Sequence, residues 1–70
     1  MEKHPDLVAL GKSIRRLRTA ANRTQEELAS IAELSTNYVG EMERGERNPS
    51  FLALVAIARA LKVSPAELFA

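Results

Sequence analysis

Apolar residues recur along the chain at the three- and four-residue steps of an α-helix, and no stretch shows the alternation typical of a strand. The first run comprises Leu7, Leu10, Ile14, Leu17 and Ala21, which predicts an amphipathic helix of about four turns. Pro5 suits the start of this helix, and Asp6 complements the positive end of its dipole. Asn22 can end it in a left-handed conformation.

The segment that follows predicts two short helices joined by a tight turn. Thr24 and Glu27 have the spacing of a capping box, which marks the start of the first helix. The buried stripe of this helix is small and apolar, comprising Leu28, Ala29 and Ala32. Small residues let two helices cross closely, as so short a connection requires.

The second helix of this pair begins after Ser35, a favourable N-cap residue. Val39 and Met42 form its buried face, and Gly45 and Asn48 mark its end. Such a pair, covering about residues 24–44, has the geometry of a helix-turn-helix, whose second helix can enter a DNA major groove.

A fourth helix is predicted from about residue 51 to 61, with Ser50 as its cap. Its sequence, FLALVAIARAL, is apolar almost all round and is interrupted only by Arg59. A helix of this kind must be buried on more than one side. In so small a domain the second side faces either another subunit or, alternatively, the rest of its own chain.

Ser64, Pro65 and Glu67 supply the cap, first-turn proline and capping-box partner of a final short helix that ends in Leu68 and Phe69. The sequence therefore predicts five helices without strands, in a single compact all-α domain of 70 residues.

Composition limits the chemistry that is available. The chain has no cysteine, and His4 has no second metal ligand nearby, so we expect no disulfide, metal or cofactor. The uncharged run at residues 48–58 is far shorter than the ~20 residues of a membrane-spanning helix, and the N-terminus lacks an apolar signal region. We expect a soluble, cytoplasmic protein that does not contact membranes.

The net charge of +1 does not by itself indicate a nucleic-acid ligand. The distribution of charge is more informative. Cations crowd the first third of the chain at Lys12, Arg15, Arg16, Arg18 and Arg23. Acidic residues follow at Glu26, Glu27 and Glu33, and then Arg44 and Arg47 flank the loop after the motif. A solvated helix face explains Arg15 and Arg16 equally well.

In this order and spacing, the segments resemble the Cro/C1-type helix-turn-helix family of XRE-like regulators. The matching segments are IRRLR at 14–18, TQEELA at 24–29, ERG at 43–45, NPS at 48–50 and IARAL at 57–61. Within that family, NYVGEMERGERN at 37–48 is similar to the controller proteins of restriction–modification systems. The resemblance implies a lambda-repressor-like DNA-binding domain and a sequence-specific transcriptional regulator, with a restriction–modification operon as one candidate target.

The resemblance also implies which residues contact DNA. Its base-reading positions are Thr36, Asn37, Tyr38 and Glu41. Asparagine can bond adenine in a bidentate way, and glutamate can accept from the cytosine amino group. Its phosphate-contacting positions are Thr24, Gln25, Ser35, Arg44, Arg47 and Asn48. Free N–H groups at a helix N-terminus suit such contacts.

Three further positions bear on the resemblance. Arg18 and Glu43 match a partly buried salt bridge that ties the first helix to the third in the family. Glu33 occupies the turn position that many helix-turn-helix proteins fill with glycine, where a left-handed conformation would cost about 1 kcal/mol. Thr36 stands where controller-like relatives commonly have arginine, so their operator sequence cannot be transferred to this chain.

One recognition helix spans only about 15 Å, so specificity calls for a homodimer whose helices enter successive major grooves about 34 Å apart. We therefore expect a near-palindromic operator. The candidate dimer-interface residues, within helices at about 51–69, are Phe51, Leu52, Val55, Leu61, Val63, Leu68 and Phe69. Some of these must belong to the core instead, and the sequence does not separate the two groups.

Regulation would follow from occupancy, because a bound dimer would block RNA polymerase or contact it from an upstream site. Repression and activation are equally compatible with the residues. The lack of a cysteine nucleophile, of a histidine in the motif and of a phosphate-binding glycine loop argues against an enzyme. The alternative is an antitoxin that also binds its own promoter. We expect no toxin-binding extension, since the sequence ends after the fifth helix.

Overall fold

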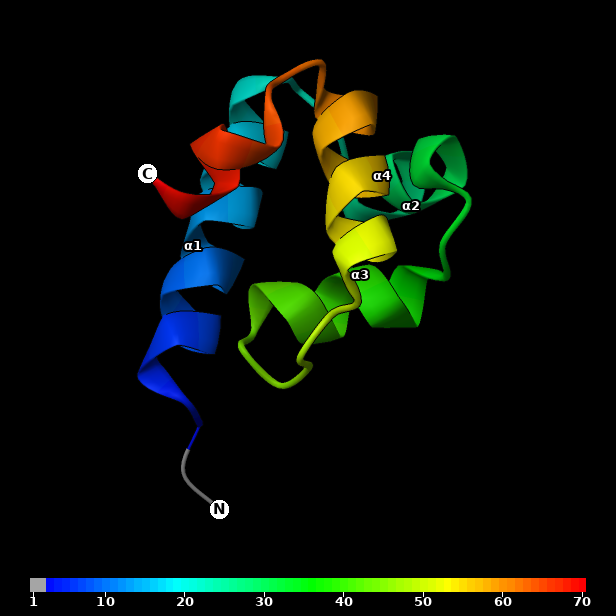
Figure 1. Cartoon of the computed structure of the whole chain (residues 1–70). Helices are drawn as coiled ribbons and strands as arrows, with labels where there is room; N and C mark the ends of the chain where they lie inside the picture. The colour runs from blue at the N-terminus through cyan, green and yellow to red at the C-terminus, as the bar shows by residue number, and fades with distance from the viewer. Residues whose placement is uncertain (1–2) are drawn as a thin grey trace.

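The computed structural model describes residues 3–70, which form four α-helices and one short 3-10 helix and contain no strand. Figure 1 shows the elements α1 (Pro5–Ala20), α2 (Gln25–Ala32), α3 (Thr36–Glu43), α4 (Phe51–Leu61) and η1 (Pro65–Phe69). The all-α prediction is confirmed. None of the helices in this range is long and apolar enough to cross a membrane.

The predicted count of five helices is slightly off, because the expected final short helix, Pro65–Phe69, is a 3-10 helix and only four α-helices are present in residues 3–70. The backbone N–H groups of Glu67 and Ala70 donate to carbonyls three residues earlier, on Ser64 and Glu67. Three-residue bonds are characteristic of short 3-10 segments, and five residues are too few to build a regular α-helical ladder. The expected cap is present in part, since the Glu67 carboxylate accepts from the Ser64 N–H at 3.2 Å.

Local capping signals determine where the helices begin. Thr24 Oγ1 accepts from the Glu27 N–H at 3.0 Å, and Glu27 Oε1 accepts from the Thr24 N–H at 2.9 Å, which completes the expected capping box. Ser35 and Ser50 accept from the N–H groups of Tyr38 and Ala53 in the same manner.

The first helix has a cap that the sequence did not suggest. His4 Nδ1 accepts from the Asp6 N–H at 3.1 Å, so the exposed imidazole serves as the N-cap of α1.

Left-handed residues end the helices. Asn22 has a φ of 57°, as the sequence predicted, and Gly45 after α3 has a φ of 73°. Glu33 and Lys62 adopt a φ of 59° without being glycine. The Leu34 N–H donates to the Ala29 carbonyl at 2.9 Å, which closes the turn after α2.

A single core holds the helices together. Its largest side chains with almost no exposure are Ile14, Leu28, Val39, Met42, Ile57 and Leu68. α3 packs against both α1 and α2, α2 packs on α4, and η1 packs on α1 and α4. Figure 1 shows α3 crossing below α4 and the C-terminal segment returning to α1, where Ser13 Oγ donates to the Ala70 carbonyl at 3.3 Å. α3 is therefore packed against two other helices.

The sequence left open whether the rest of the chain covers α4 on all sides, and the structure shows that it does not. Its own chain buries only one face, comprising Ala53, Ile57, Ala58 and Leu61. Phe51 and Leu52 remain 74% and 76% exposed, so the chain does not cover the whole helix.

The candidate dimer-interface residues also separate by burial. Leu61 and Leu68 are buried within the single chain, so their assignment to an interface is corrected to the core. Val55 and Val63 are partly buried, and Phe69 is 67% exposed. The reason for the correction is that η1 folds back onto α1 and α4, and these helices bury its own Leu68 completely.

Candidate nucleic-acid interface

α3 presents one face to solvent and one to the core. Val39 and Met42 are buried, whereas Thr36 and Asn37 in the first turn are exposed. Tyr38 and Glu41 are half-buried, at the border between the two faces. The leading end of the helix is therefore available to a ligand.

The turn between α2 and α3 determines the position of the N-terminal end of α3. Glu33 adopts the left-handed conformation that glycine would favour, and Leu34 packs against the core directly after it. The cost of this conformation, of order 1 kcal/mol, is offset by the burial of Leu34 and the closing hydrogen bond to Ala29.

A partly buried ion pair fixes the far end of α3. Arg18 Nε donates to Glu43 Oε2 at 2.6 Å, and Arg18 Nη2 donates to Glu43 Oε1 at 3.0 Å. The side chains are only 12% and 3% exposed. The hydrogen bonds to Glu43 raise the pKa of Arg18 above its ordinary value. The resemblance implied this pair, and it joins α1 to α3 in the structure.

Gln25 belongs to the same cluster. Its Nε2 donates to Glu43 Oε1 at 2.9 Å, so the side-chain amide is used inside the protein. The first backbone N–H groups of α2 have no partner within the helix and can still meet a phosphate. The hydroxyl of Thr24, which accepts in the capping box, keeps a proton to donate.

A second charged cluster lies beside the exposed face. Arg47 donates from Nε and Nη2 to Glu41 Oε1, at 3.2 and 2.7 Å. The guanidinium also lies over the Tyr38 ring, 5.0 Å from its centroid. The Tyr38 hydroxyl in turn accepts from the Ser50 N–H at 3.2 Å. Tyr38 and Glu41, which are expected to read bases, thus both contact Arg47, which is expected to bind phosphate.

The remaining expected phosphate contacts are exposed. Ser35 caps α3 through its hydroxyl, and Asn48 lies in the loop before α4. Arg44 donates to Glu46 Oε1 at 3.0 Å, and Lys3 lies 3.7 Å from the other oxygen of Glu46. The hydrogen bond from Arg44 is the main reason why the pKa of Glu46 is lowered.

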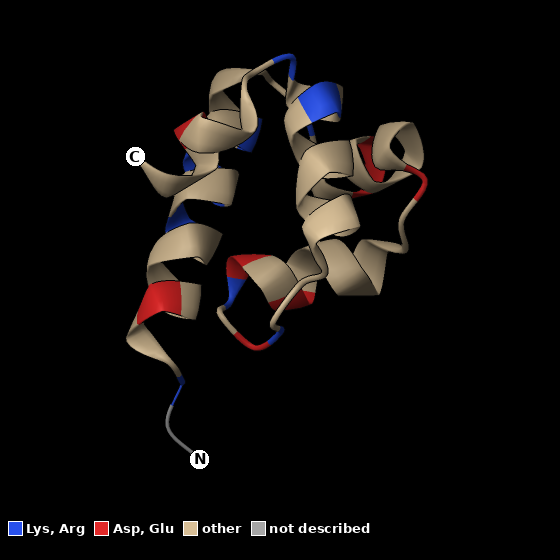
Figure 2. Ribbon diagram, in the orientation of Figure 1, with Lys and Arg blue, Asp and Glu red and all other residues tan. Residues whose placement is uncertain are grey.

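Charge is distributed unevenly around α3. Figure 2 shows mixed blue and red segments at the C-terminal end of α3 and in the loop after it, whereas the leading half of the helix is tan. The sequence of that half, Thr36–Gly40, contains no ionisable acid or base except the tyrosine. Its contacts with a ligand would be hydrogen bonds and apolar contacts, flanked by the arginines of the loop.

Gly11 is a positioning residue that the sequence reasoning missed. A Cβ atom on Gly11 would lie 2.4 Å from the Met42 carbonyl oxygen and 2.5 Å from that of Glu43. The C-terminal turn of α3 therefore rests directly on the backbone of α1. The available signal was a glycine inside an otherwise regular helical pattern, which often marks a close approach.

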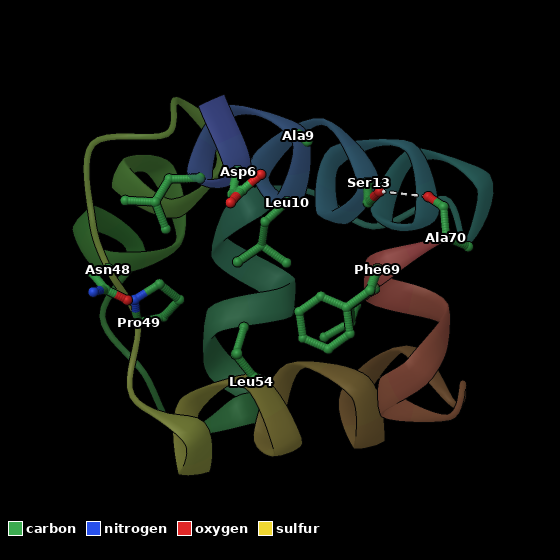
Figure 3. Close-up of a pocket in the computed structure, with 11 residues that line it drawn as sticks. Asp6, Ala9, Leu10, Ser13, Asn48, Pro49, Leu54, Phe69 and Ala70 are labelled. Carbon is green, nitrogen blue, oxygen red and sulfur yellow. Dashed lines mark hydrogen bonds between the residues drawn. The ribbon is translucent and has the colours of Figure 1, made fainter. Parts of the chain in front are cut away.

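A separate apolar groove lies between α1, η1 and the loop before α4. It has a volume of about 460 Å³. Figure 3 shows Leu10, Leu54, Pro49 and Phe69 around it, with the Phe69 ring directed into the space. Leu54, which lines the groove, follows the exposed Phe51 by about one turn of α4.

Two short helices joined through a left-handed residue, with the leading side chains of the second exposed, define a helix-turn-helix protein. The family model described as helix-turn-helix (HTH_3) matches residues 14–68, and the chain belongs to this family.

Several known proteins are similar to this chain over most of its length. The control protein C.SmaI of Serratia marcescens is 39% identical over 84% of this chain and 70% of its own length. The uncharacterized HTH-type transcriptional regulator y4dJ of Sinorhizobium fredii is 41% identical over 84% of this chain and 77% of its own length. The crystal structure of the restriction-modification controller protein C.AhdI from Aeromonas hydrophila superposes with a TM-score of 0.93 and 45% identity, covering 94% of this chain and all of that one (100%).

Proposed function

We propose that the protein is a sequence-specific double-stranded DNA-binding transcriptional regulator. The observation that carries this proposal is the first turn of α3, where Thr36 and Asn37 are exposed while the opposite face of the helix is buried. A helix anchored in this way can enter the major groove, which is wide enough to admit it. Arg44 and Arg47, which are both exposed, would contact the phosphates that flank the helix.

The regulated genes would be those of a restriction–modification system. Two relatives support this narrower proposal, since C.SmaI is named a control protein and C.AhdI a restriction-modification controller protein. The operator would differ from that of controller proteins with arginine at this position, because the proposed reading position at residue 36 holds threonine. A protein dimer bound to the operator would block RNA polymerase or, at an upstream site, contact it.

The regulator would act as a homodimer on a near-palindromic operator. Among residues 3–70, the most exposed large apolar side chains are those of Phe51, Leu52 and Phe69, and Phe69 also lines the apolar groove together with Leu54. A second copy would cover this surface and present a second α3 to the next major groove.

Selection of bound duplexes from a random library tests the function directly. We expect an enriched, near-palindromic consensus, with affinity that falls steeply with salt as phosphates are neutralised. Recovery of no consensus, together with capture of a host protein by the same chain, would favour the antitoxin alternative and contradict the proposal.

Sedimentation at micromolar concentration tests the dimer. We expect the Leu52→Glu variant to sediment as a monomer, because a buried charge without a partner opposes association. The matched control is Ile31→Glu, since Ile31 is also exposed, at 48%, but lies on α2. A monomeric unmodified protein would contradict the proposed dimer.

A further inference from the structure

The contact between Glu41 and Arg47 bears on how α3 would read a base. Both hydrogen bonds from Arg47 reach the same carboxylate oxygen, Oε1. Among residues 3–70, no hydrogen bond reaches Oε2 of Glu41. Both side chains are partly exposed, at 35% for Glu41 and 50% for Arg47. One oxygen is thus held by the protein and the other remains available.

Arg47 is itself held in place. Its guanidinium lies over the Tyr38 ring at 5.0 Å, and the Tyr38 hydroxyl accepts from the backbone N–H of Ser50 at 3.2 Å. A series of contacts therefore leads from the N-terminal cap of α4 through Tyr38 and Arg47 to Glu41. A cation at this distance from an aromatic face is attracted to it, and the planar guanidinium is well suited to both contacts.

A carboxylate on a recognition helix faces an electrostatic problem. The phosphates that flank the major groove repel it, and an unconstrained glutamate has several rotamers to lose on binding. An arginine bound to one oxygen offsets the charge and reduces this loss. The other oxygen can then accept a hydrogen bond from a cytosine amino group, which is the favourable base contact for glutamate.

We propose that Arg47 is a positioning residue for sequence specificity, which holds Glu41 so that its free oxygen reads a cytosine. This inference rests on the proposed DNA-binding function and assigns Arg47 a role beyond a phosphate contact. Arg44 provides the contrast, because it pairs with Glu46 in the loop and not with a residue of α3.

The test compares variants on the consensus duplex and on duplexes with each base pair changed. Glu41→Ala identifies the base pair at which Glu41 contributes discrimination, with an expected loss of roughly five- to 150-fold. Arg47→Ala should lose discrimination at that same base pair. Arg47→Lys should lose it as well, because lysine retains the charge but not the planar two-nitrogen contact.

Two further comparisons separate positioning from simple charge. Arg44→Ala should weaken binding to all duplexes alike and reduce the salt slope by about one, without changing the base preference. The double variant Glu41→Ala with Arg47→Ala should bind more tightly than Arg47→Ala alone, because it removes the carboxylate that Arg47 no longer neutralises. Thermal melting of each variant confirms that these partly exposed substitutions leave the fold intact.

The inference is overturned if Arg47→Ala weakens binding but keeps the discrimination at the base pair that Glu41 reads. It is also overturned if Glu41→Ala changes preference at no base pair. Both results are distinct from a failure of the proposed function, in which the unmodified protein itself would select no consensus.

Discussion

The carboxylate of Glu43 on α3 accepts two hydrogen bonds from the Arg18 guanidinium on α1, at 2.6 and 3.0 Å, and a third from Gln25 on α2, at 2.9 Å. One acidic side chain thus joins the first three helices at the end of α3 opposite its exposed turn. Because the side chains of this pair are only 12% and 3% exposed, its removal should affect the orientation of α3 as well as the stability of the fold.

Substituting one partner of this pair should be severely destabilising. Arg18→Met leaves the Glu43 carboxylate buried without its cation, and we expect the free energy of unfolding to fall by about 3–5 kcal/mol. Urea denaturation measures this change. The double variant Arg18→Met with Glu43→Leu should recover much of the loss, since it removes the uncompensated charge. Additive losses in the double variant would contradict a direct coupling.

Gly11→Ala should displace α3 from α1. The added methyl group would lie 2.4 Å from the Met42 carbonyl oxygen, and backbone atoms cannot move away without shifting a helix. We expect a loss of about 1–3 kcal/mol, as in other overpacked sites, measured by urea denaturation.

Gly40→Ala is the matched control for that substitution. Its methyl group would lie 3.1 Å from the tip of the Arg44 side chain, which is 55% exposed and free to move. Alanine is also the better helix former by up to about 1 kcal/mol, so stability should be unchanged or slightly higher. Equal losses from the two substitutions would show that close approach is not the cause.

Glu27 should make stability depend on pH in a defined direction. Its hydrogen bonds with Thr24, first that from the Thr24 N–H, lower the pKa of Glu27 below its ordinary value of 4.5 in the folded chain. A carboxyl group with a lowered folded pKa stabilises above the unfolded value and loses this contribution as the pH falls through the folded value.

The comparison with Glu27→Gln isolates this effect, because glutamine can form the capping box but does not titrate. The stability difference between the two proteins should be constant at neutral pH and should change only as the pH falls below about 4.5. Thermal unfolding at several pH values measures it. A difference that does not vary with pH would contradict the assignment of the shift to this contact.

Contacts between residues close together in the sequence were predictable, whereas contacts between distant segments were not. The caps at Thr24, Ser35 and Ser50 were predictable because each contact joins residues three apart. The left-handed end at Asn22 was also local. The approach of Gly11 to α3 was not, since it joins segments about thirty residues apart in the sequence through the packing of the core.

The sequence also could not show which apolar residues in the last third of the chain are buried and which are exposed. Leu68 and Phe69 are neighbours in sequence, yet one is fully buried and the other is 67% exposed. Their separation depends on the 3-10 geometry of η1 and on its return to α1. The pairing of Glu41 with Arg47 depends in the same way on the path of the loop after α3.

Asn37→Ala should relax preference at a single base pair. The exposed amide at the front of α3 can make two hydrogen bonds to adenine, and its loss should cost roughly 1–3 kcal/mol of discrimination. Binding-site selection with the variant measures this. Asn48→Ala, in the loop before α4, is the control, and it should weaken binding without changing the consensus. An unchanged consensus for Asn37→Ala would exclude this side chain as a base reader.

The proposed function requires the leading turn of α3 to enter the DNA major groove. Backbone amide chemical shifts, measured with and without the selected duplex, show which residues the DNA contacts. We predict that the largest changes occur at Thr36, Asn37 and Tyr38, with smaller ones in the loop at Arg44 and Arg47. Changes confined to α1 or to η1, with those of α3 unaffected, would contradict it.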